Sequence, residues 1–106
     1  MKISVLLPYK ENFSSNYAGA VSLFVKDTIE NSSFFKNSYI FGNMPYKKPL
    51  LKNYLNIDLK KSIFKSNSKN YVAKFLDKEK LINSDIIEIH NRPNYVQYLK
   101  NLENKK

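Results

Sequence analysis

Short and almost uninterrupted apolar runs alternate along this chain with segments of helical periodicity. The first run occupies residues 2–8 and is rich in branched aliphatic side chains. A run without polar alternation is typical of a central parallel strand that is buried on both faces. Residues 85–90 form a similar isoleucine-rich run, and residues 38–42 form another candidate strand that ends at Gly42.

The segments between these runs have the spacing of one-sided helices. In residues 18–30 the apolar positions are Val21, Phe24, Val25, Thr28 and Ile29. Ser68 is a candidate N-cap for a second helix, whose expected apolar face is Tyr71, Val72, Phe75, Leu76 and Ile82. Pro93 suits the first position of a third helix, with an expected face of Tyr95, Val96, Leu99 and Leu102.

This alternation predicts an α/β fold, a Rossmann-like open and mainly parallel sheet flanked by helices. The length of 106 residues fits a single domain over residues 1–106, with a polar tail at 103–106 that is expected to fray. Residues 44–66 are ambiguous, because Pro45 and Pro49 interrupt regular structure. This stretch either adds a short strand at residues 54–57 or forms a ligand-binding excursion.

The composition limits where the protein works. The longest apolar runs are about seven residues, whereas a membrane-spanning helix needs roughly 20. The start lacks the long apolar region and the cleavage site of a secretory signal, so we expect a cytoplasmic protein. The absence of cysteine excludes disulfides, thiolate zinc sites and cysteine nucleophiles.

The net charge of +9 predicts a surface that attracts polyanions. Arg92 is the only arginine among the eighteen basic residues. Because sequence-reading proteins use arginine for bidentate contacts to guanine and phosphate, this composition disfavours specific nucleic-acid recognition. A small polyanion-binding module is an alternative, with an expected aromatic and lysine face of Tyr46, Lys47, Lys48, Tyr54, Lys60 and Lys61.

Two segments follow predicted strands at the end of the sheet where such folds bind ligands. The first leads to Ala18 and Gly19 at the start of a helix, where free backbone amides suit phosphate and a missing Cβ permits close approach. Packing is the alternative role of this glycine. The loop matches neither G-x-G-x-x-G nor the P-loop pattern, which disfavours a dinucleotide enzyme or an ATPase.

The second segment begins at His90, the only histidine. Its imidazole could hydrogen-bond to a sugar hydroxyl or carbonyl, or share a proton near neutral pH; the alternative is a histidine satisfied by neighbouring backbone. Arg92 beside it could bind an anionic group or cap the sheet edge. With one histidine and no cysteine, a histidine-based metal site is excluded, and no G-x-S-x-G pattern precedes His90 to form a serine triad.

Together, residues 2–8, the Ala18-Gly19-Ala20 helix start and residues 84–93 resemble the amino-terminal domain of family-four glycosyltransferases. These enzymes have the GT-B architecture, in which two Rossmann-like domains face each other across a cleft. The resemblance implies that His90 is catalytic and reaches the transferred sugar. It also implies that Gly19 lies near the donor phosphates and the acceptor. Beside these two residues, we expect Ala18, Asn91 and Arg92 to bind substrate or donor. Many members have paired glycines where this chain has Ala18-Gly19.

The resemblance implies a retaining enzyme that moves a hexose from a nucleotide sugar to a glycan or lipid acceptor, with no metal and no resident cofactor. The carboxy-terminal domain of the family is missing from this sequence. We therefore expect an incomplete domain that is inactive alone, with an exposed sheet edge open to homo-oligomer formation. The implied location is cytoplasmic, with peripheral attachment at the inner membrane face as an option. A non-enzymatic interaction domain is a further alternative.

Overall fold

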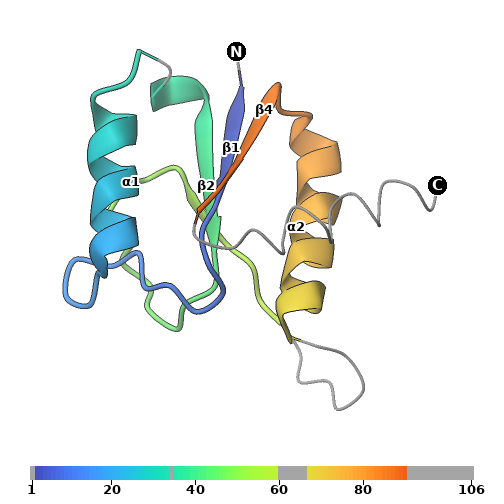
Figure 1. Ribbon diagram of the computed structural model, residues 1–106, viewed down its shortest axis with the longest axis horizontal. Coiled ribbons are helices and arrows are strands. Elements are labelled where there is room, and N and C mark those ends of the chain that lie inside the picture. The colour runs from blue at the N-terminus through green and yellow to red at the C-terminus, as the bar shows by residue number, and fades with distance from the viewer. Residues whose placement is uncertain (1, 34, 60–66, 91–106) are drawn as a thin grey trace.

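The computed structural model describes residues 2–33, 35–59 and 67–90 (Figure 1). The described elements are β1 (Ile3–Leu6), α1 (Ala20–Glu30), the 3-10 turn η1 (Phe35–Asn37), β2 (Ser38–Gly42), β3 (Tyr54–Asn56), α2 (Asn67–Ile82) and β4 (Ile86–Ile89). The predicted third helix and the predicted frayed tail at 103–106 lie outside the described residues.

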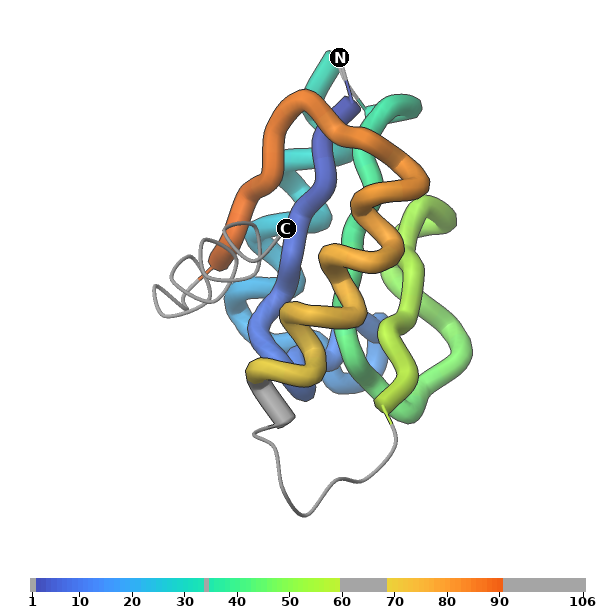
Figure 2. Tube along the Cα trace, turned by 90° about the vertical axis from the view of Figure 1, so that its right-hand side faces the viewer, coloured from blue at the N-terminus to red at the C-terminus, as the bar shows by residue number. Residues whose placement is uncertain are grey.

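The four described strands form one sheet in the order β3-β2-β1-β4, and every neighbouring pair is parallel. Helix α1 covers one face of the sheet and α2 covers the other (Figure 1). Figure 2 shows the strand order from the α2 side, with β1 between β4 and β2. The predicted α/β fold, a Rossmann-like open parallel sheet flanked by helices, is confirmed.

Strand β1 lies inside the sheet and contributes to two apolar layers. Val5 and Leu7 pack in the cluster beneath α1, whereas Leu6 packs in the cluster beneath α2. All three side chains are buried. The absence of polar alternation in residues 2–8 therefore reflects burial on both faces, as predicted.

Helix α1 begins at Ala20, two residues later than predicted, with Gly19 as an extended N-cap at φ −85°. Val25 and Ile29 are buried against the sheet, as predicted. Phe24 is 60% exposed and Thr28 is also exposed, so the predicted apolar face was wrong at these two positions. The core-facing stripe is narrower than the apolar pattern, because these two residues lie on the side of α1 nearest β4.

The stretch at residues 44–66, which the sequence left ambiguous, contains the strand β3. β3 pairs in parallel with β2, and Tyr54 at its start is only 9% exposed. The Tyr54 ring stacks on Phe13 with centroids 5.5 Å apart and passes closely over Gly42. A Cβ added at Gly42 would lie 2.8 Å from the Tyr54 hydroxyl oxygen, so the glycine is required for this approach.

Helix α2 covers the second face through Tyr71, Val72 and Phe75, which are fully buried as predicted. The Tyr71 hydroxyl donates to the carbonyl oxygens of Leu7 at 2.6 Å and Phe41 at 3.3 Å. These hydrogen bonds join α2 to the ends of β1 and β2. The predicted N-cap was wrong, because Ser68 lies within the described helix rather than before it.

Glu79 is a buried carboxylate near the end of α2 that the sequence pattern did not indicate. Ser4 Oγ donates to it at 2.6 Å, and the Ser84 backbone amide donates to it at 2.7 Å. Hydrogen bonds to an ionised acceptor are stronger than neutral ones. They tie α2 to β1 and to the connection that leads into β4, and this fixes where β4 enters the sheet.

Candidate functional site

The site lies where the path of the chain reverses. From β1 the chain moves outward through β2 to β3, and it then returns to place β4 on the other side of β1. The connections therefore diverge at the carboxyl ends of β1 and β4, which is where open α/β sheets bind ligands. The sequence predicted strands at both places, and the structure makes them parallel neighbours from the Ile3–Ile86 pair to the Leu6–Ile89 pair.

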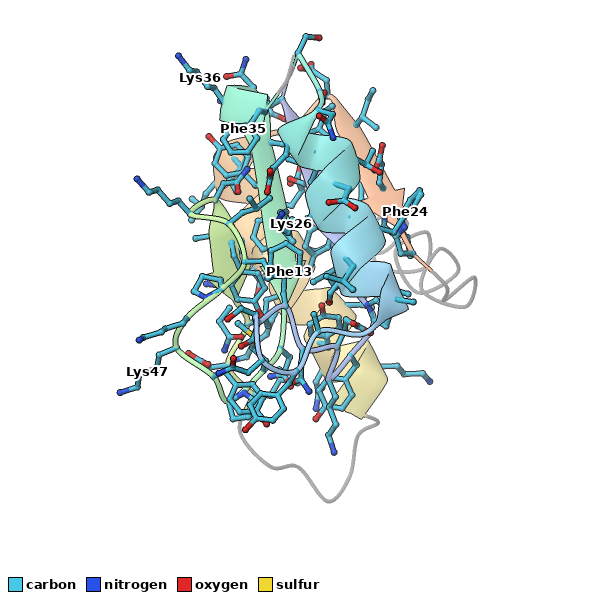
Figure 3. All side chains as sticks on the ribbon, turned by 90° about the vertical axis from the view of Figure 1, so that its left-hand side faces the viewer. Phe13, Phe24, Lys26, Phe35, Lys36 and Lys47 are labelled. Carbon is cyan, nitrogen blue, oxygen red and sulfur yellow. The ribbon has the colours of Figure 1, made fainter. Side chains whose placement is uncertain are left out.

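A crevice of about 400 Å³ opens between α1 and β4 at this point. Its lining residues are Phe24, Val25, Thr28, Ile29, Glu88, Ile89 and His90. Figure 3 shows Phe24 projecting from α1 toward the carboxyl end of β4. The walls are thus mainly apolar, with one imidazole and one carboxylate, a composition typical of small-ligand sites.

His90 is positioned by backbone pairing and by an aromatic contact. Its amide donates to the Leu6 carbonyl at 3.4 Å, which holds the residue beside the end of β1. Its ring lies 6.2 Å from the Phe24 ring at an interplanar angle of 64°, an edge-to-face arrangement. The imidazole Nε2 lies 3.6 Å from a Glu88 carboxylate oxygen, and the side chain is partly exposed to the crevice.

The start of α1 holds an internal carboxylate. A Cβ at Gly19 would lie 3.0 Å from Glu11 Oε2, and Ser22 Oγ donates to the same oxygen at 2.6 Å. A negative group is favoured here, because the amino-terminal end of a helix carries partial positive charge. An anionic ligand at Gly19 must therefore displace the Glu11 side chain. Neither Glu11 nor Ser22 was predicted as a site residue, although a serine inside the apolar stripe of α1 was an available signal.

The structure brings the start of α1 and His90 to the same end of the sheet. The Leu23 amide donates to the Gly19 carbonyl in the first turn of α1, and Phe24, the next residue, contacts His90. Ala18 precedes this turn and is partly buried. Asn91 and Arg92 lie outside the described residues, so their predicted binding roles stay predictions.

The alternative aromatic and lysine face is smaller than predicted. Tyr46, Lys47 and Lys48 are exposed, and Tyr46 stacks on Tyr17 with ring centroids 4.5 Å apart. The prediction was wrong for Tyr54, which packs inward on the core. Lys60 and Lys61 lie outside the described residues.

The chain was compared with protein-family models, curated proteins and solved structures. No protein-family model, curated protein or solved structure matches this chain. None of the helices in the described part of the chain is both long and apolar enough to cross a membrane. The fold and the crevice define the chain as an α/β Rossmann-like domain with a candidate ligand site at its strand-order reversal.

Proposed function

We propose that the chain is the acceptor-side, amino-terminal part of a retaining glycosyltransferase that moves a hexose from a nucleotide sugar to a glycan or lipid acceptor. The supporting observation is the position of His90. Its imidazole lines a crevice at the carboxyl ends of β1 and β4, on the same rim as the start of α1. The sequence resemblance assigns the sugar-contacting histidine to this residue.

The proposed role of His90 is to contact the sugar while the bond to the donor phosphate breaks. A new bond forms between the anomeric carbon and the acceptor oxygen, and the leaving phosphate takes the proton of the acceptor. No protein base is required for this step. His90 hydrogen-bonds to the sugar, and the Glu88 carboxylate 3.6 Å from its Nε2 supplies negative charge beside the partial positive charge that develops on the sugar.

The Glu11 carboxylate refines the role of Gly19 within this proposal. A phosphate at Gly19 would meet the negative charge of Glu11, which already accepts a hydrogen bond from Ser22. A sugar hydroxyl would instead donate a hydrogen bond to that carboxylate. We therefore assign the rim at Gly19 to a hydroxyl group of the acceptor or the transferred sugar.

The test is a transfer assay on the full-length gene product. The protein is incubated with nucleotide sugars and with glycan or lipid acceptors, and the release of nucleoside diphosphate and the hexose content of the acceptor are measured. We expect release that depends on an acceptor. Release of nucleoside diphosphate that does not depend on an acceptor for any donor would contradict this proposal. Oligonucleotide binding that weakens steeply with salt would then favour the polyanion-binding alternative.

A further inference from the structure

A second cavity lies at the carboxyl ends of β2 and β3, away from His90. Its volume is about 540 Å³, within the range of roughly 300–1,000 Å³ that is usual for small-molecule sites. The polar residues that line it are Lys10, Asn12, Asn43, Tyr46, Asn56 and Asp58. None of its lining residues also lines the crevice at His90.

The walls of this cavity are fixed by hydrogen bonds. Asn43 Nδ2 donates to the Ile57 carbonyl at 2.8 Å. The side-chain Oδ1 of Asn56 accepts hydrogen bonds from the Met44 backbone amide at 2.9 Å and from the Tyr54 hydroxyl at 2.8 Å. These bonds hold the segments after β2 and β3 together, so a ligand meets a preformed surface and loses little affinity to ordering of the protein.

Lys10 reaches this cavity from an unfavourable backbone conformation. The Glu11 amide donates to the Pro8 carbonyl to close a turn, and Lys10 occupies the third position of that turn with φ 67°. Glycine or asparagine usually occupies such a position, and strained residues gather at functional sites. The Lys10 ammonium lies 5.5 Å from the centre of the Tyr9 ring, and no described residue forms an ion pair with it.

The chemistry of the lining indicates the class of ligand. Lys10 only donates hydrogen bonds, Asp58 only accepts them when ionised, and the Asn12 amide does both. Hydroxyl groups match such a mixed set. A phosphate attracted by Lys10 is also repelled by Asp58, and a cation attracted by Asp58 is also repelled by Lys10, so a neutral ligand suits this lining better. The Tyr46 ring adds an apolar wall on which the carbon face of a sugar ring can pack.

We propose that this cavity binds a neutral saccharide unit. The inference goes beyond the proposed function, because binding here does not require that the chain takes part in sugar transfer. Asn12 is the residue best suited to test saccharide binding, because its side-chain amide forms no hydrogen bond with the other described residues. Removal of this side chain therefore leaves the hydrogen bonds of Asn43 and Asn56 in place.

The experiment is an NMR titration of the 106-residue chain without any donor. Methyl glycosides of glucose, mannose, galactose and N-acetylglucosamine are added separately, and the side-chain amide signals of Asn12, Asn43 and Asn56 are followed. We expect at least one glycoside to shift these signals saturably and inorganic phosphate to leave them unchanged. No saturable shift with any glycoside, or a shift with phosphate alone, would overturn the proposal.

Two variants and one control sharpen the test. Asn12→Ala and Lys10→Gly should each weaken glycoside binding by about 10-fold, the usual effect of losing one hydrogen bond. Asn37→Ala alters an exposed asparagine before β2, at the opposite end of the sheet, and should leave binding unchanged. Equal affinities for all three variants and the parent chain would place the ligand elsewhere and overturn the assignment.

Discussion

Phe24 and His90 meet edge to face at the rim of the sheet, with ring centroids 6.2 Å apart. The first belongs to α1 and the second follows β4, so this contact joins two elements that are far apart in the sequence. It exists because β1 and β4 are neighbours although most of the described chain lies between them. The contact closes one side of the crevice in which the proposed sugar chemistry takes place.

Phe24→Ala should change the surroundings of His90 without unfolding the domain. Phe24 is 60% exposed, so the free energy of unfolding should fall by less than about 1 kcal/mol. The ring protons of His90 should shift in the NMR spectrum, because they lose the neighbouring aromatic ring. Leu23→Ala is the matched control, since Leu23 is exposed on the same helix but does not line the crevice. Equal His90 shifts in both variants would contradict the observed contact.

The two glycines should respond differently to a methyl group. At Gly42 a Cβ would lie within 3 Å of the Tyr54 ring, which is itself packed on Phe13. Gly42→Ala should therefore lower the free energy of unfolding by about 1–3 kcal/mol, the usual cost of overpacking. At Gly19 the new methyl meets only the end of the Glu11 side chain. Denaturant unfolding of both variants checks this order, and a larger loss for Gly19→Ala would contradict it.

The sequence was sufficient to predict β1, β2 and β4 as strands of a parallel sheet, but it left β3 open and indicated only part of the site. The uninterrupted apolar run of β1 reflects burial on both faces. The similar isoleucine-rich run of β4 correctly predicted a strand, but β4 lies at an edge of the described sheet and its side chains are exposed or only partly buried. The exposure of Phe24 was not predictable, because a helical pattern does not say how far the sheet beneath it extends. Glu11 beside Gly19 also could not be predicted, since that contact depends on how the loop at residues 8–19 folds back on α1.

Tyr71→Phe should destabilise the domain by about 1–3 kcal/mol. The lost hydroxyl donates to the carbonyl oxygens of Leu7 and Phe41, and both bonds are buried. Tyr39→Phe is a matched control, because Tyr39 packs at the edge of the same cluster and no described residue hydrogen-bonds to its hydroxyl. Equal unfolding midpoints for the two variants would show that the Tyr71 hydroxyl does not stabilise the strand ends.

Stability should fall at alkaline pH because of Tyr54. Burial raises the pKa of the Tyr54 phenol above its ordinary value, and the charge of Asp58 adds to this effect. The folded state therefore holds the proton more tightly than the unfolded chain, in which the pKa is about 10. The resulting stability is fully present below that pH and is lost as the pH rises above it.

The contribution of Tyr54 is isolated by measuring the free energy of unfolding at a series of pH values above neutrality. The proteins compared are the parent chain, Tyr54→Phe and Tyr46→Phe. Tyr54→Phe should show a shallower alkaline loss than the parent chain. Tyr46→Phe, which alters an exposed tyrosine, should follow the parent. Parallel curves for all three proteins would contradict a raised pKa at Tyr54.

The most direct test of the account is the turnover of His90→Ala in the proposed full-length glycosyltransferase at saturating donor and acceptor. His90 lines the crevice where the strand order reverses, and its proposed contact with the sugar acts mainly in the transition state. Turnover should fall by about 100-fold or more, the effect of removing a group that stabilises charge developing in the transition state, while the unfolding midpoint changes little. Unchanged turnover would contradict the proposed role of the imidazole and, with it, the sugar-transfer function.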